Sequence, residues 1–450
     1  MTPTLPDFPP SRTYPLRIDI AAPPFTGFTL ANGLRVIFCP DHSTPMVTIN
    51  VLYHVGSKNE ERGRTGFAHL FEHLMFDGSQ HVERGGYDRF CTSVGGDNNA
   101  FTSSDITDYY ISLPADRLAL GLWLESDRMA GFAIQEVSLV TQKNVVIEEK
   151  RQSTDDVPYG DATIAMRELA YDPSHPYSWE PIGSIEDINA AQMDDVRAFY
   201  QRFYIPSNAM LVIAGDFDAV QARKLVEGYF GPIPAGDPVV RPMVNPELER
   251  HGARVRIDSP IIPFNAVFLG YHAPGIHHHD IYPLELLTAI MAEGESSRLY
   301  QTLEYTQEIA SEAECFIDDG ELGSIFYVYA VAQQANVMPR ELEEALRLEI
   351  RRVAEEGVSE RELEKVKNKK VTRVVHSLQS ISNRAERLAY FSMLLNDPLL
   401  AFREADLYAG VSVEDIRRVA RRYLLGAEPN VVEYYQASRK KRRANAAGAS

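Results

Sequence analysis

The residues best able to do chemistry lie in the pentapeptide His69-Leu70-Phe71-Glu72-His73. In an α-helix, residues four apart lie one turn above each other on the same face, so His69 and His73 can direct their imidazole nitrogens at one metal ion. Glu72 lies near the same face, where it can hold a water molecule. A hydrolytic zinc ion needs this arrangement of protein ligands, an open position for water and a carboxylate that takes the proton.

The pentapeptide has a simpler interpretation, in which two helix histidines lie partly exposed beside a glutamate that forms ion pairs. A chance match is uncommon, because the chain has only 12 His among its 450 residues and the motif needs two of them at a fixed spacing. H-x-x-E-H is also the arrangement found in inverted zincins. We therefore prefer a zinc site of the kind that hydrolyses peptide bonds.

Further motifs extend the similarity over nearly the whole chain. With them, the chain resembles the pitrilysin and insulinase family of zinc peptidases, particularly its branch of short chains similar to the mitochondrial processing peptidase. Besides the pentapeptide, the motifs that carry the resemblance are Gly95-Gly96, Asn99-Ala100-Phe101-Thr102-Ser103, Thr107-Asp108-Tyr109-Tyr110, Asn144-Val145-Val146-Ile147-Glu148-Glu149, His175-Pro176-Tyr177, Gly183 and Ser296-Ser297-Arg298-Leu299.

The resemblance implies a third metal ligand, a glutamate distal to the second histidine. Glu149, which lies 76 residues after His73, matches that position. Glu148 is the competing residue, but it lies about 100° away around a helix and would point off the metal face. The resemblance thus implies one zinc ion per chain, bound by His69, His73 and Glu149, with Glu72 as the catalytic general base.

Two further positions are assigned by the resemblance. The family usually carries another glutamate seven residues before the third ligand, where this chain has Gln142. Glutamine keeps the shape without the charge, and we expect it to orient a zinc ligand by hydrogen bonding from outside the metal's own contacts. Asn99, Ala100, Phe101 and Thr102 match the family's edge strand, which binds peptide substrates through main-chain hydrogen bonds. The alternative is an ordinary sheet strand with Phe101 in the core.

The elements that must position these residues form an α+β mixture. A hairpin is predicted where Phe28–Leu30 and Leu34–Phe38 flank Asn32-Gly33, the favoured two-residue turn. The next strand is Met46–Val55, where apolar and polar residues alternate. We expect helices over 66–76, 87–94, 115–129 and 134–151 and strands over 100–104 and 109–113, with the helices packed on a mostly antiparallel sheet.

The chain divides at a linker, because Gly231–Pro238 contains three Pro and two Gly. The sequence after it repeats the sequence before it: Asp195-Val196-Arg197 parallels Asp415-Ile416-Arg417 at an offset of 220 residues. Chance similarity between two helices is the alternative. We predict two homologous domains in a clamshell-type assembly. The zinc-binding catalytic domain covers residues 1–230, the linker 231–255, and the second domain, without a metal site, 256–450.

The second half has lost the metal-binding residues. At an offset of 216, the three polar residues of the pentapeptide correspond to Glu285, Thr288 and Ala289, which cannot build the site. His277-His278-His279 is a possible substitute, but it follows Pro274-Gly275, which favours a polar loop.

The resemblance also exposes a missing pair of residues. Self-sufficient family members offer an Arg, and seven residues later a Tyr, to the substrate from the second half. Here Glu304 and Ser311 stand at those positions, and a slip of one residue brings Tyr305 to the first but no Arg. We therefore expect a homodimer or heterodimer in which a related subunit supplies the Arg/Tyr pair. Loss of one oxyanion donor typically costs ~10²–10³ in turnover.

Composition limits the remaining possibilities. With 45 Lys plus Arg against 63 Asp plus Glu, the net charge of −18 argues against a nucleic-acid partner. Cys39, Cys91 and Cys315 are odd in number and far apart, which excludes a disulfide framework. No run approaches the ~20 apolar residues of a membrane span. The expected location is the cytoplasm, or the periplasm if a signal peptide was removed. The Pro-rich first 25 residues are expected to be extended, and the basic Ser438–Arg443 segment to be a solvated tail rather than a nuclear address.

These observations predict a zinc metalloendopeptidase that hydrolyses short or unfolded peptides inside a chamber. The main alternative is a non-catalytic structural subunit of a processing-peptidase-like complex, which Glu304 and Ser311 partly favour. A zinc-dependent protein that binds peptides without cutting them is the third possibility.

Overall fold

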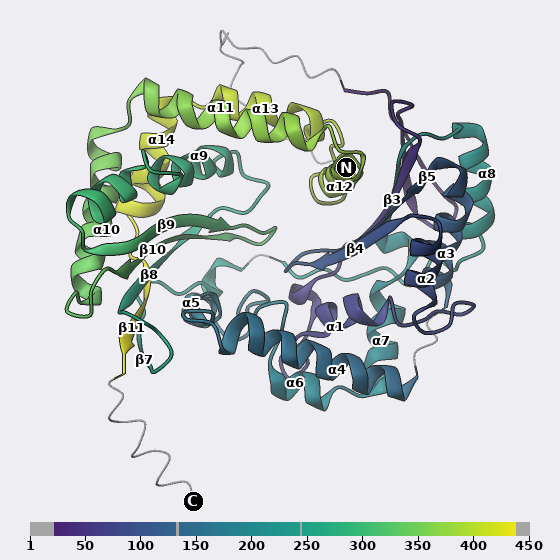
Figure 1. Cartoon of the computed structure of the whole chain (residues 1–450), viewed down its shortest axis with the longest axis horizontal. Coiled ribbons are helices and arrows are strands. Elements are labelled where there is room, and N and C mark those ends of the chain that lie inside the picture. Colours follow the sequence, from purple (N-terminus) through teal and green to yellow (C-terminus); the bar gives the residue numbers. More distant parts are fainter. Residues whose placement is uncertain (1–21, 132–134, 244, 438–450) are drawn as a thin grey trace, which may run out of the picture.

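The computed structural model describes residues 22–131, 135–243 and 245–437. In them the chain forms two mixed sheets, each flanked by helices, at opposite ends of a clamshell (Figure 1). The predicted α+β class with two homologous parts is confirmed. Ile134, the Pro-rich residues 1–21 and the basic C-terminal segment lie outside the described residues.

The first sheet has the strand order β1-β2-β6-β3-β5-β4. Its pairs are antiparallel except for β2 and β6, which run parallel. The middle strands are rich in Val, Ile and Leu and are buried on both faces, as expected for strands covered by helices on two sides. Its strands are β1 (Thr26–Thr29), β2 (Arg35–Pro40), β3 (Met46–Tyr53), β4 (Asp97–Thr102), β5 (Thr107–Pro114) and β6 (Ala209–Gly215).

The second sheet repeats this topology with the order β7-β11-β8-β10-β9. Again only one pair, β7 and β11, is parallel, and it occupies the place of β2 and β6. The two sheets therefore correspond strand by strand, except that β1 has no counterpart among the described strands. The strands are β7 (Arg254–Ser259), β8 (Ala266–Ala273), β9 (Ala310–Asp318), β10 (Ser324–Ala332) and β11 (Asn430–Gln436).

The helices follow the same repeat, and α1 to α4 lie close to the four helices predicted for the first half. The first-half helices are α1 (Phe67–Leu74), α2 (Gly86–Ser93), α3 (Leu118–Ala130), α4 (Glu136–Lys150), α5 (Ala162–Ala170), α6 (Ile185–Ala190), α7 (Met193–Phe203) and α8 (Ala219–Phe230). Those of the second half are α9 (Ile281–Ala292), α10 (Pro339–Glu356), α11 (Glu360–Ser377), α12 (Ile381–Leu394), α13 (Leu400–Gly410) and α14 (Val413–Val419).

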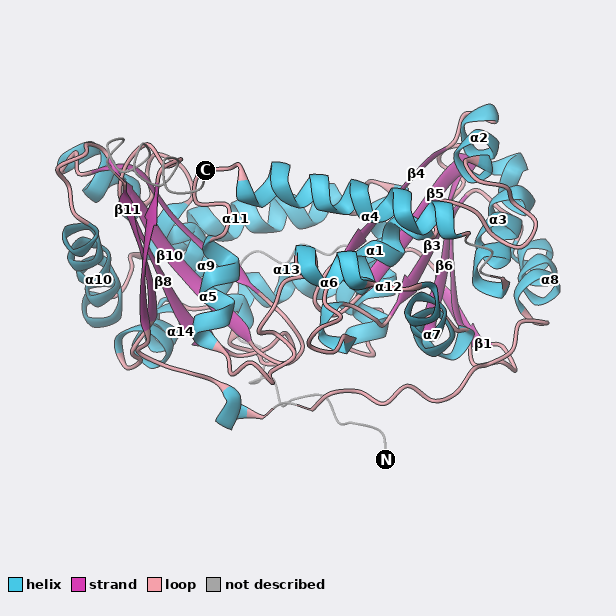
Figure 2. Cartoon of the chain, turned by 90° about the horizontal axis from the view of Figure 1, so that it is seen from below, coloured by secondary structure: helices cyan, strands magenta, loops and turns pink. Residues whose placement is uncertain are grey.

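The two halves exchange one helix each. Helix α12 of the second half packs on β3 and β6 of the first sheet, and α5 of the first half packs on β8 and β11 of the second (Figure 2). Helices α1, α3, α7 and α8 cover the other face of the first sheet, and α9, α10 and α14 that of the second. The exchange buries apolar surface between the halves, and each Å² of buried apolar surface stabilises the fold by about 25 cal/mol. The two halves should therefore unfold together.

The turn of the first hairpin differs from its prediction. Leu30 N–H donates to the Leu34 carbonyl (2.9 Å), and Gly33 N–H donates to the Leu30 carbonyl (3.0 Å), which leaves a three-residue loop. Gly33 has a φ of +88°, which only glycine adopts without strain. Asn32 donates its amide to the Phe230 carbonyl (2.8 Å) at the end of α8. The hairpin is confirmed and the two-residue turn is wrong, because Asn32 anchors the loop to α8.

The connection between the sheets follows the predicted linker. In the described part of residues 231–253, the only regular element is the short turn η5 (Pro246–Leu248). The domain boundaries themselves stay a prediction, because α5 and α12 lie across them. Among the described residues, no helix is both long and apolar enough to cross a bilayer.

Candidate metal centre

The start of α1 is fixed by a carboxylate that the sequence analysis missed. Glu60 accepts hydrogen bonds from the N–H groups of Gly66 (2.9 Å) and Ala68 (2.8 Å), and Trp179 Nε1 donates to it at 3.1 Å. A carboxylate at a helix N-terminus is favourable, because it satisfies free N–H groups and interacts with the helix dipole. Glu60 lies six residues before the helix entry, so no capping pattern in the sequence could identify it.

Helix α1 presents one apolar and one polar face. Leu70, Phe71 and Leu74 are fully buried in the core beneath the first sheet. This packing turns the side chains of His69 and His73 toward α4, which crosses close by. The amphipathic pattern of the pentapeptide thus determines which side chains can meet Glu149.

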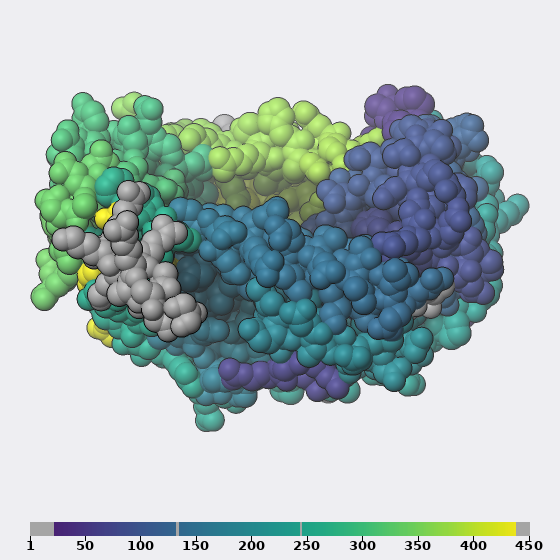
Figure 3. All heavy atoms as spheres, turned by 60° about the horizontal axis from the view of Figure 1, so that its bottom comes forward, coloured from purple at the N-terminus to yellow at the C-terminus, as the bar shows by residue number. Residues whose placement is uncertain are grey.

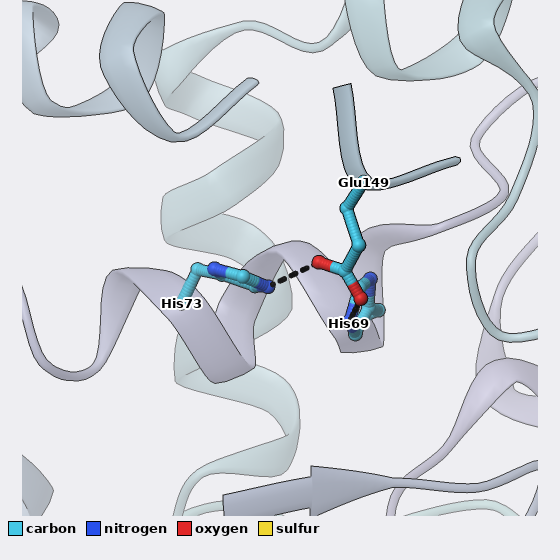
Figure 4. Close-up of side chains that lie close together, drawn as sticks. All are labelled: His69, His73 and Glu149. Atoms are coloured by element: carbon cyan, nitrogen blue, oxygen red, sulfur yellow. Dashed lines mark ion pairs between the residues drawn. The ribbon is translucent and has the colours of Figure 1, made fainter. Parts of the chain in front are cut away.

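The three predicted ligands come together at one point (Figure 4). His69 Nε2 lies 3.5 Å from Glu149 Oε1, and His73 Nε2 lies 3.2 Å from Glu149 Oε2. The two imidazole rings are perpendicular, with centroids 4.9 Å apart. The site opens to solvent on the Glu149 side, because the exposed fraction of the side chain rises from 12% for His69 to 43% for Glu149.

The surroundings keep both rings neutral. Burial, together with the neighbouring His73, lowers the pKa of His69 to about 4. Burial also lowers the pKa of His73, although Glu149 partly offsets this. A metal-ligating histidine must be neutral, and two imidazole nitrogens with one carboxylate are a donor set that zinc accepts. The residues present therefore fit a zinc ion.

The competing carboxylate points elsewhere. Glu148 is exposed, accepts a hydrogen bond from Gln152 Nε2 (2.9 Å) and lies 3.6 Å from Arg151. The structure thus brings Glu149, rather than Glu148, to the two histidines. The role of Glu149 as a ligand stays a prediction.

Glu72 lies beside this cluster and is held by the edge strand. Thr102 Oγ1, at the end of β4, donates to Glu72 Oε2 at 2.6 Å. Burial raises the pKa of Glu72, the Thr102 hydrogen bond opposes that shift, and the charge on Glu149 adds to it. Sequence reasoning had placed Thr102 in the substrate-binding strand and missed this contact, since residues 30 apart on a helix and a strand give no signal of meeting.

The remaining substrate-strand residues lie along β4, which forms the edge of the first sheet. Its outer side has no neighbouring strand in the described residues. Of its main-chain groups, the Ala100 N–H donates to Asn99 Oδ1 (2.9 Å), a local bond that a bound peptide would have to replace. Phe101 is 37% exposed, which excludes the alternative of a core residue. Asn99 is also exposed, and Ala100 packs against the core.

Gln142 does not contact the three ligands in the described hydrogen bonds. Its Nε2 donates to Asp77 Oδ1 (3.2 Å), which also accepts from Arg84 Nε (3.0 Å). Its predicted role in orienting a ligand stays a prediction.

The positions expected to hold an Arg and a Tyr are occupied by groups with local partners. Glu304 accepts from the Ala313 N–H (3.0 Å), and Ser311 lies on β9 and donates to the Ala332 carbonyl (3.2 Å). Tyr305 is 69% exposed. The predicted loop at His277–His279 is confirmed, since it lies between β8 and α9.

Comparisons with known proteins agree with this geometry. Residues 35–166 match the model of the insulinase family (peptidase family M16), and residues 190–370 match the peptidase M16 inactive domain. The zinc protease PqqE of Helicobacter pylori is 29% identical over 413 residues, which cover 91% of this chain and 92% of the relative. The probable zinc protease PqqL of Escherichia coli is 26% identical over 83% of this chain and 42% of its own length.

Solved structures show the same fold. The crystal structure of a protease from Helicobacter pylori matches with a TM-score of 0.85 and 29% identity, over 92% of this chain and all of that one. The first half of the periplasmic protease PqqL from Escherichia coli has a TM-score of 0.73 at 21% identity, over 92% of each chain. On these matches, together with the inverted motif on α1, the chain belongs to peptidase family M16, the insulinase and pitrilysin family.

Proposed function

We propose that this chain is a zinc metalloendopeptidase, with His69, His73 and Glu149 as ligands and Glu72 as general base. The observation that carries the proposal is the convergence of two neutral imidazole Nε2 atoms on the two oxygens of Glu149. Glu72 lies next to them without being one of them. The zinc-protease names of the relatives support the same metal and the same reaction class.

When bound, zinc supplies Lewis acidity that polarises a peptide carbonyl and lowers the pKa of water. Glu72 then accepts the proton of the attacking water and delivers it to the leaving amine. Burial raises the pKa of Glu72, which makes its carboxylate a better proton acceptor than an exposed one. Thr102 holds one oxygen of Glu72 and leaves the other to face the substrate.

The substrates we propose are short or unfolded peptides. An extended peptide can add to β4 through main-chain hydrogen bonds, which give affinity without a strict sequence requirement. The exposed Phe101 offers an apolar contact beside that strand. The molecular face in Figure 3 is hollowed between residues of the two halves, and a chain enclosed there must be extended to reach β4.

We propose further that a related subunit supplies the Arg/Tyr pair in a heterodimer, since a second copy of this chain would bring only Glu304 and Ser311 again. Glu304 and Ser311 cannot replace it, because a carboxylate repels a developing oxyanion and the Ser311 hydroxyl is bonded to a strand carbonyl. The Escherichia coli relative PqqL is a periplasmic protease, which supports the periplasm as the alternative location of this chain.

A structural subunit without turnover is the second candidate. It is favoured by Glu304 and Ser311 and by the match of residues 190–370 to an inactive domain. The complete set of ligands around α1 favours the peptidase.

The test is cleavage of a quenched, unstructured peptide by the purified chain, zinc-loaded, chelated and as Glu72→Gln, with zinc counted in parallel. Zinc-dependent cleavage that Glu72→Gln abolishes supports the peptidase and contradicts the need for a second subunit. If the chain binds zinc and cleaves only after a related subunit is added, the result supports both the zinc peptidase and the need for a second subunit. A chain that holds no zinc at His69, His73 and Glu149 contradicts the proposal, and uncut peptide bound by the zinc-loaded chain identifies a binding protein.

A further inference from the structure

A second group of metal-ligating side chains lies where the linker meets the second sheet. Glu249 and His251 belong to the linker just before β7, and His272 lies on β8. One ligand atom from each of the three lies within 4.8 Å of the others. None of these residues belongs to the centre around His69.

The hydrogen bonds of His272 determine which of its nitrogens is free. Its Nε2 lies 3.1 Å from the Ala170 carbonyl and 3.0 Å from the Arg250 carbonyl. Carbonyl oxygens only accept hydrogen bonds, so Nε2 carries the proton and Nδ1 carries the lone pair in the neutral ring.

The free nitrogen of His272 faces a carboxylate. Nδ1 lies 3.8 Å from Glu249 Oε2, and the two side chains are only 9% and 22% exposed. Among the described residues, no N–H or O–H group donates to the Glu249 carboxylate. Two acceptors that face each other in a half-buried site have no hydrogen between them, and a cation is what makes such a pair favourable.

The spacing suits a metal ion rather than a proton. Two ligands bound to one zinc ion at about 2 Å each lie roughly 3–4 Å apart, whereas a hydrogen bond would need about 3 Å or less. The His251 ring lies 4.7 Å from the His272 ring, centroid to centroid, and is exposed, so it can turn toward the ion. A ligating histidine that donates its other N–H to a backbone carbonyl is the usual arrangement at metal sites.

We propose that Glu249, His251 and His272 form a second divalent-metal site, for zinc or a similar first-row ion, with a structural role. Two nitrogen donors and one carboxylate match the preference of such ions. The segment that carries Glu249 and His251 already contacts the C-terminal end of α5, since Arg250 N–H donates to the Ala170 carbonyl (2.7 Å). The ion fastens this linker segment to β8.

The other cluster of this kind does not need a cation. His278 and His279 lie beside Asp280, but Asp280 already accepts from Arg418 (2.7 Å) and Tyr423 (2.8 Å). The arginine charge compensates that carboxylate within the chain. His279 therefore serves as the matched control for a surface histidine beside a carboxylate.

The experiment counts zinc in the full chain after equilibration with zinc alone and removal of loosely held metal. We expect about two ions per chain in the wild type and about one in His251→Ala, Glu249→Gln and His73→Ala. The double variant His73→Ala/His251→Ala should hold almost none, and His279→Ala should match the wild type. Because His251 is exposed, its replacement leaves the fold intact.

A second readout is thermal unfolding. Zinc should raise the unfolding midpoint of the wild type by more than that of His251→Ala, since an ion that binds only the folded chain stabilises it. The proposal is overturned if His251→Ala and Glu249→Gln keep the zinc count and the zinc-dependent shift of the wild type. Failure of the catalytic proposal would instead appear as an unchanged zinc count in His73→Ala, so the two outcomes are distinguishable.

Discussion

The two halves of the chain place equivalent pairs of helices beside equivalent sheets, but the pairs differ in what lies between them. In the first half, α1 and α4 bring two histidine rings to the carboxylate of Glu149. In the second, α9 and α11 bring Glu285 to the ammonium group of Lys370, and Tyr408 Oη also donates to Glu285 at 2.5 Å. One fold thus holds an incomplete site in one half and a self-contained ion pair in the other.

The two carboxylates, Glu285 and Glu149, differ in what lies beside them to compensate their negative charge. Lys370 neutralises the second-half carboxylate within the chain, so no ligand is needed there. Burial lowers the pKa of both rings that face Glu149, and the chain provides no lysine or arginine at this place in the described contacts, which is consistent with the proposed zinc ion. If the proposed zinc site is correct, the second half keeps the same packing with a Lys370–Glu285 ion pair at the equivalent place.

The largest loss of activity is expected for Glu72, which corresponds to Thr288 in the second half. Glu72→Gln should lower peptide cleavage by about 10²–10⁴-fold, the usual contribution of a general base. Bound zinc should remain, because Glu72 is not a ligand. Thr288→Val changes the matching position on α9, where the hydroxyl only donates to the Glu285 carbonyl (2.8 Å), and should leave cleavage unchanged. Equal loss in both variants would contradict the assignment.

The next largest effect is expected on zinc binding when Glu149 is replaced. Glu149→Gln should weaken zinc binding by more than about 10²-fold, since loss of a direct ligand exceeds the 10–100-fold effect of groups that only orient ligands. Competition with a chromogenic chelator measures the affinity. Glu148→Gln is the matched control on the next residue and should bind zinc as the wild type does. The ligand assignment fails if the two variants behave in the reverse way.

A third prediction concerns the ion pair through which Glu321 of the second half contacts the first half. Glu321, between β9 and β10, accepts from His54 Nε2 (2.7 Å) and pairs with Lys58 of the first half. Burial alone would raise the pKa of Glu321, but the His54 hydrogen bond and the Lys58 charge outweigh it and hold the pKa at about 2. The unfolded value is higher, so this contribution is complete above about pH 4.5 and is lost as the pH falls toward 2.

We expect Glu321→Gln to lower the free energy of unfolding by about 2–3 kcal/mol near neutral pH. The difference from the wild type should shrink as the pH falls from 4.5 to 2, which denaturant unfolding at several pH values measures. Glu61→Gln alters a glutamate whose side chain is 75% exposed and should show little difference at any pH. A pH-independent difference for Glu321→Gln would contradict the ion-pair explanation.

A smaller effect is expected for the hydroxyl that holds the general base. Thr102→Val removes the hydrogen bond to Glu72 and should lower cleavage by about 10- to 10²-fold, because a hydrogen bond to a charged group contributes about 1.5–3 kcal/mol. Zinc content should not change. Thr92→Val, whose hydroxyl donates only within its own helix (2.7 Å to the Asp88 carbonyl), is the control. An unchanged rate would show that Thr102 does not position Glu72.

Much of this comparison could be predicted from the sequence. The spacing of His69 and His73 determines a shared helix face, and the offset of 216 places Glu285 where the first half has His69. Glu149 was found only through the family resemblance, since nothing local links residues so far apart. The contacts of Glu60, Thr102 and Lys370 were not predicted, because they depend on how helices and strands cross in space.

The exchange of α5 and α12 between the halves also could not be predicted from the sequence. Periodicity predicts that each helix has an apolar face, but not which of two similar sheets it covers. The two-residue turn at Asn32-Gly33 failed for the same kind of reason. Its local pattern favoured a tight turn, and the tertiary hydrogen bond from Asn32 to the end of α8 selected a longer loop.

The smallest effect is expected on stability, when the ion pair between Lys370 and Glu285 in the second half is broken. Lys370→Met should lower the free energy of unfolding by about 1 kcal/mol, because both partners are partly exposed, at 31% for Lys370 and 25% for Glu285, and exposed pairs contribute little. Tyr408 still donates to Glu285, which limits the loss further. The exchanged helices couple the halves, so denaturant should unfold the chain in a single transition whose midpoint reports this change.

Zinc content and cleavage should stay at the wild-type level in Lys370→Met, since the first-half site shares no residue with this pair. Lys224→Met, at an exposed position of α8, controls for the loss of one positive charge and should unfold as the wild type does. If Lys370→Met instead gained a bound zinc ion, Glu285 would be a latent ligand that lysine suppresses. If it lost the first-half zinc, the two helix pairs would be coupled, and the halves could not be treated as separate sites on one repeated fold.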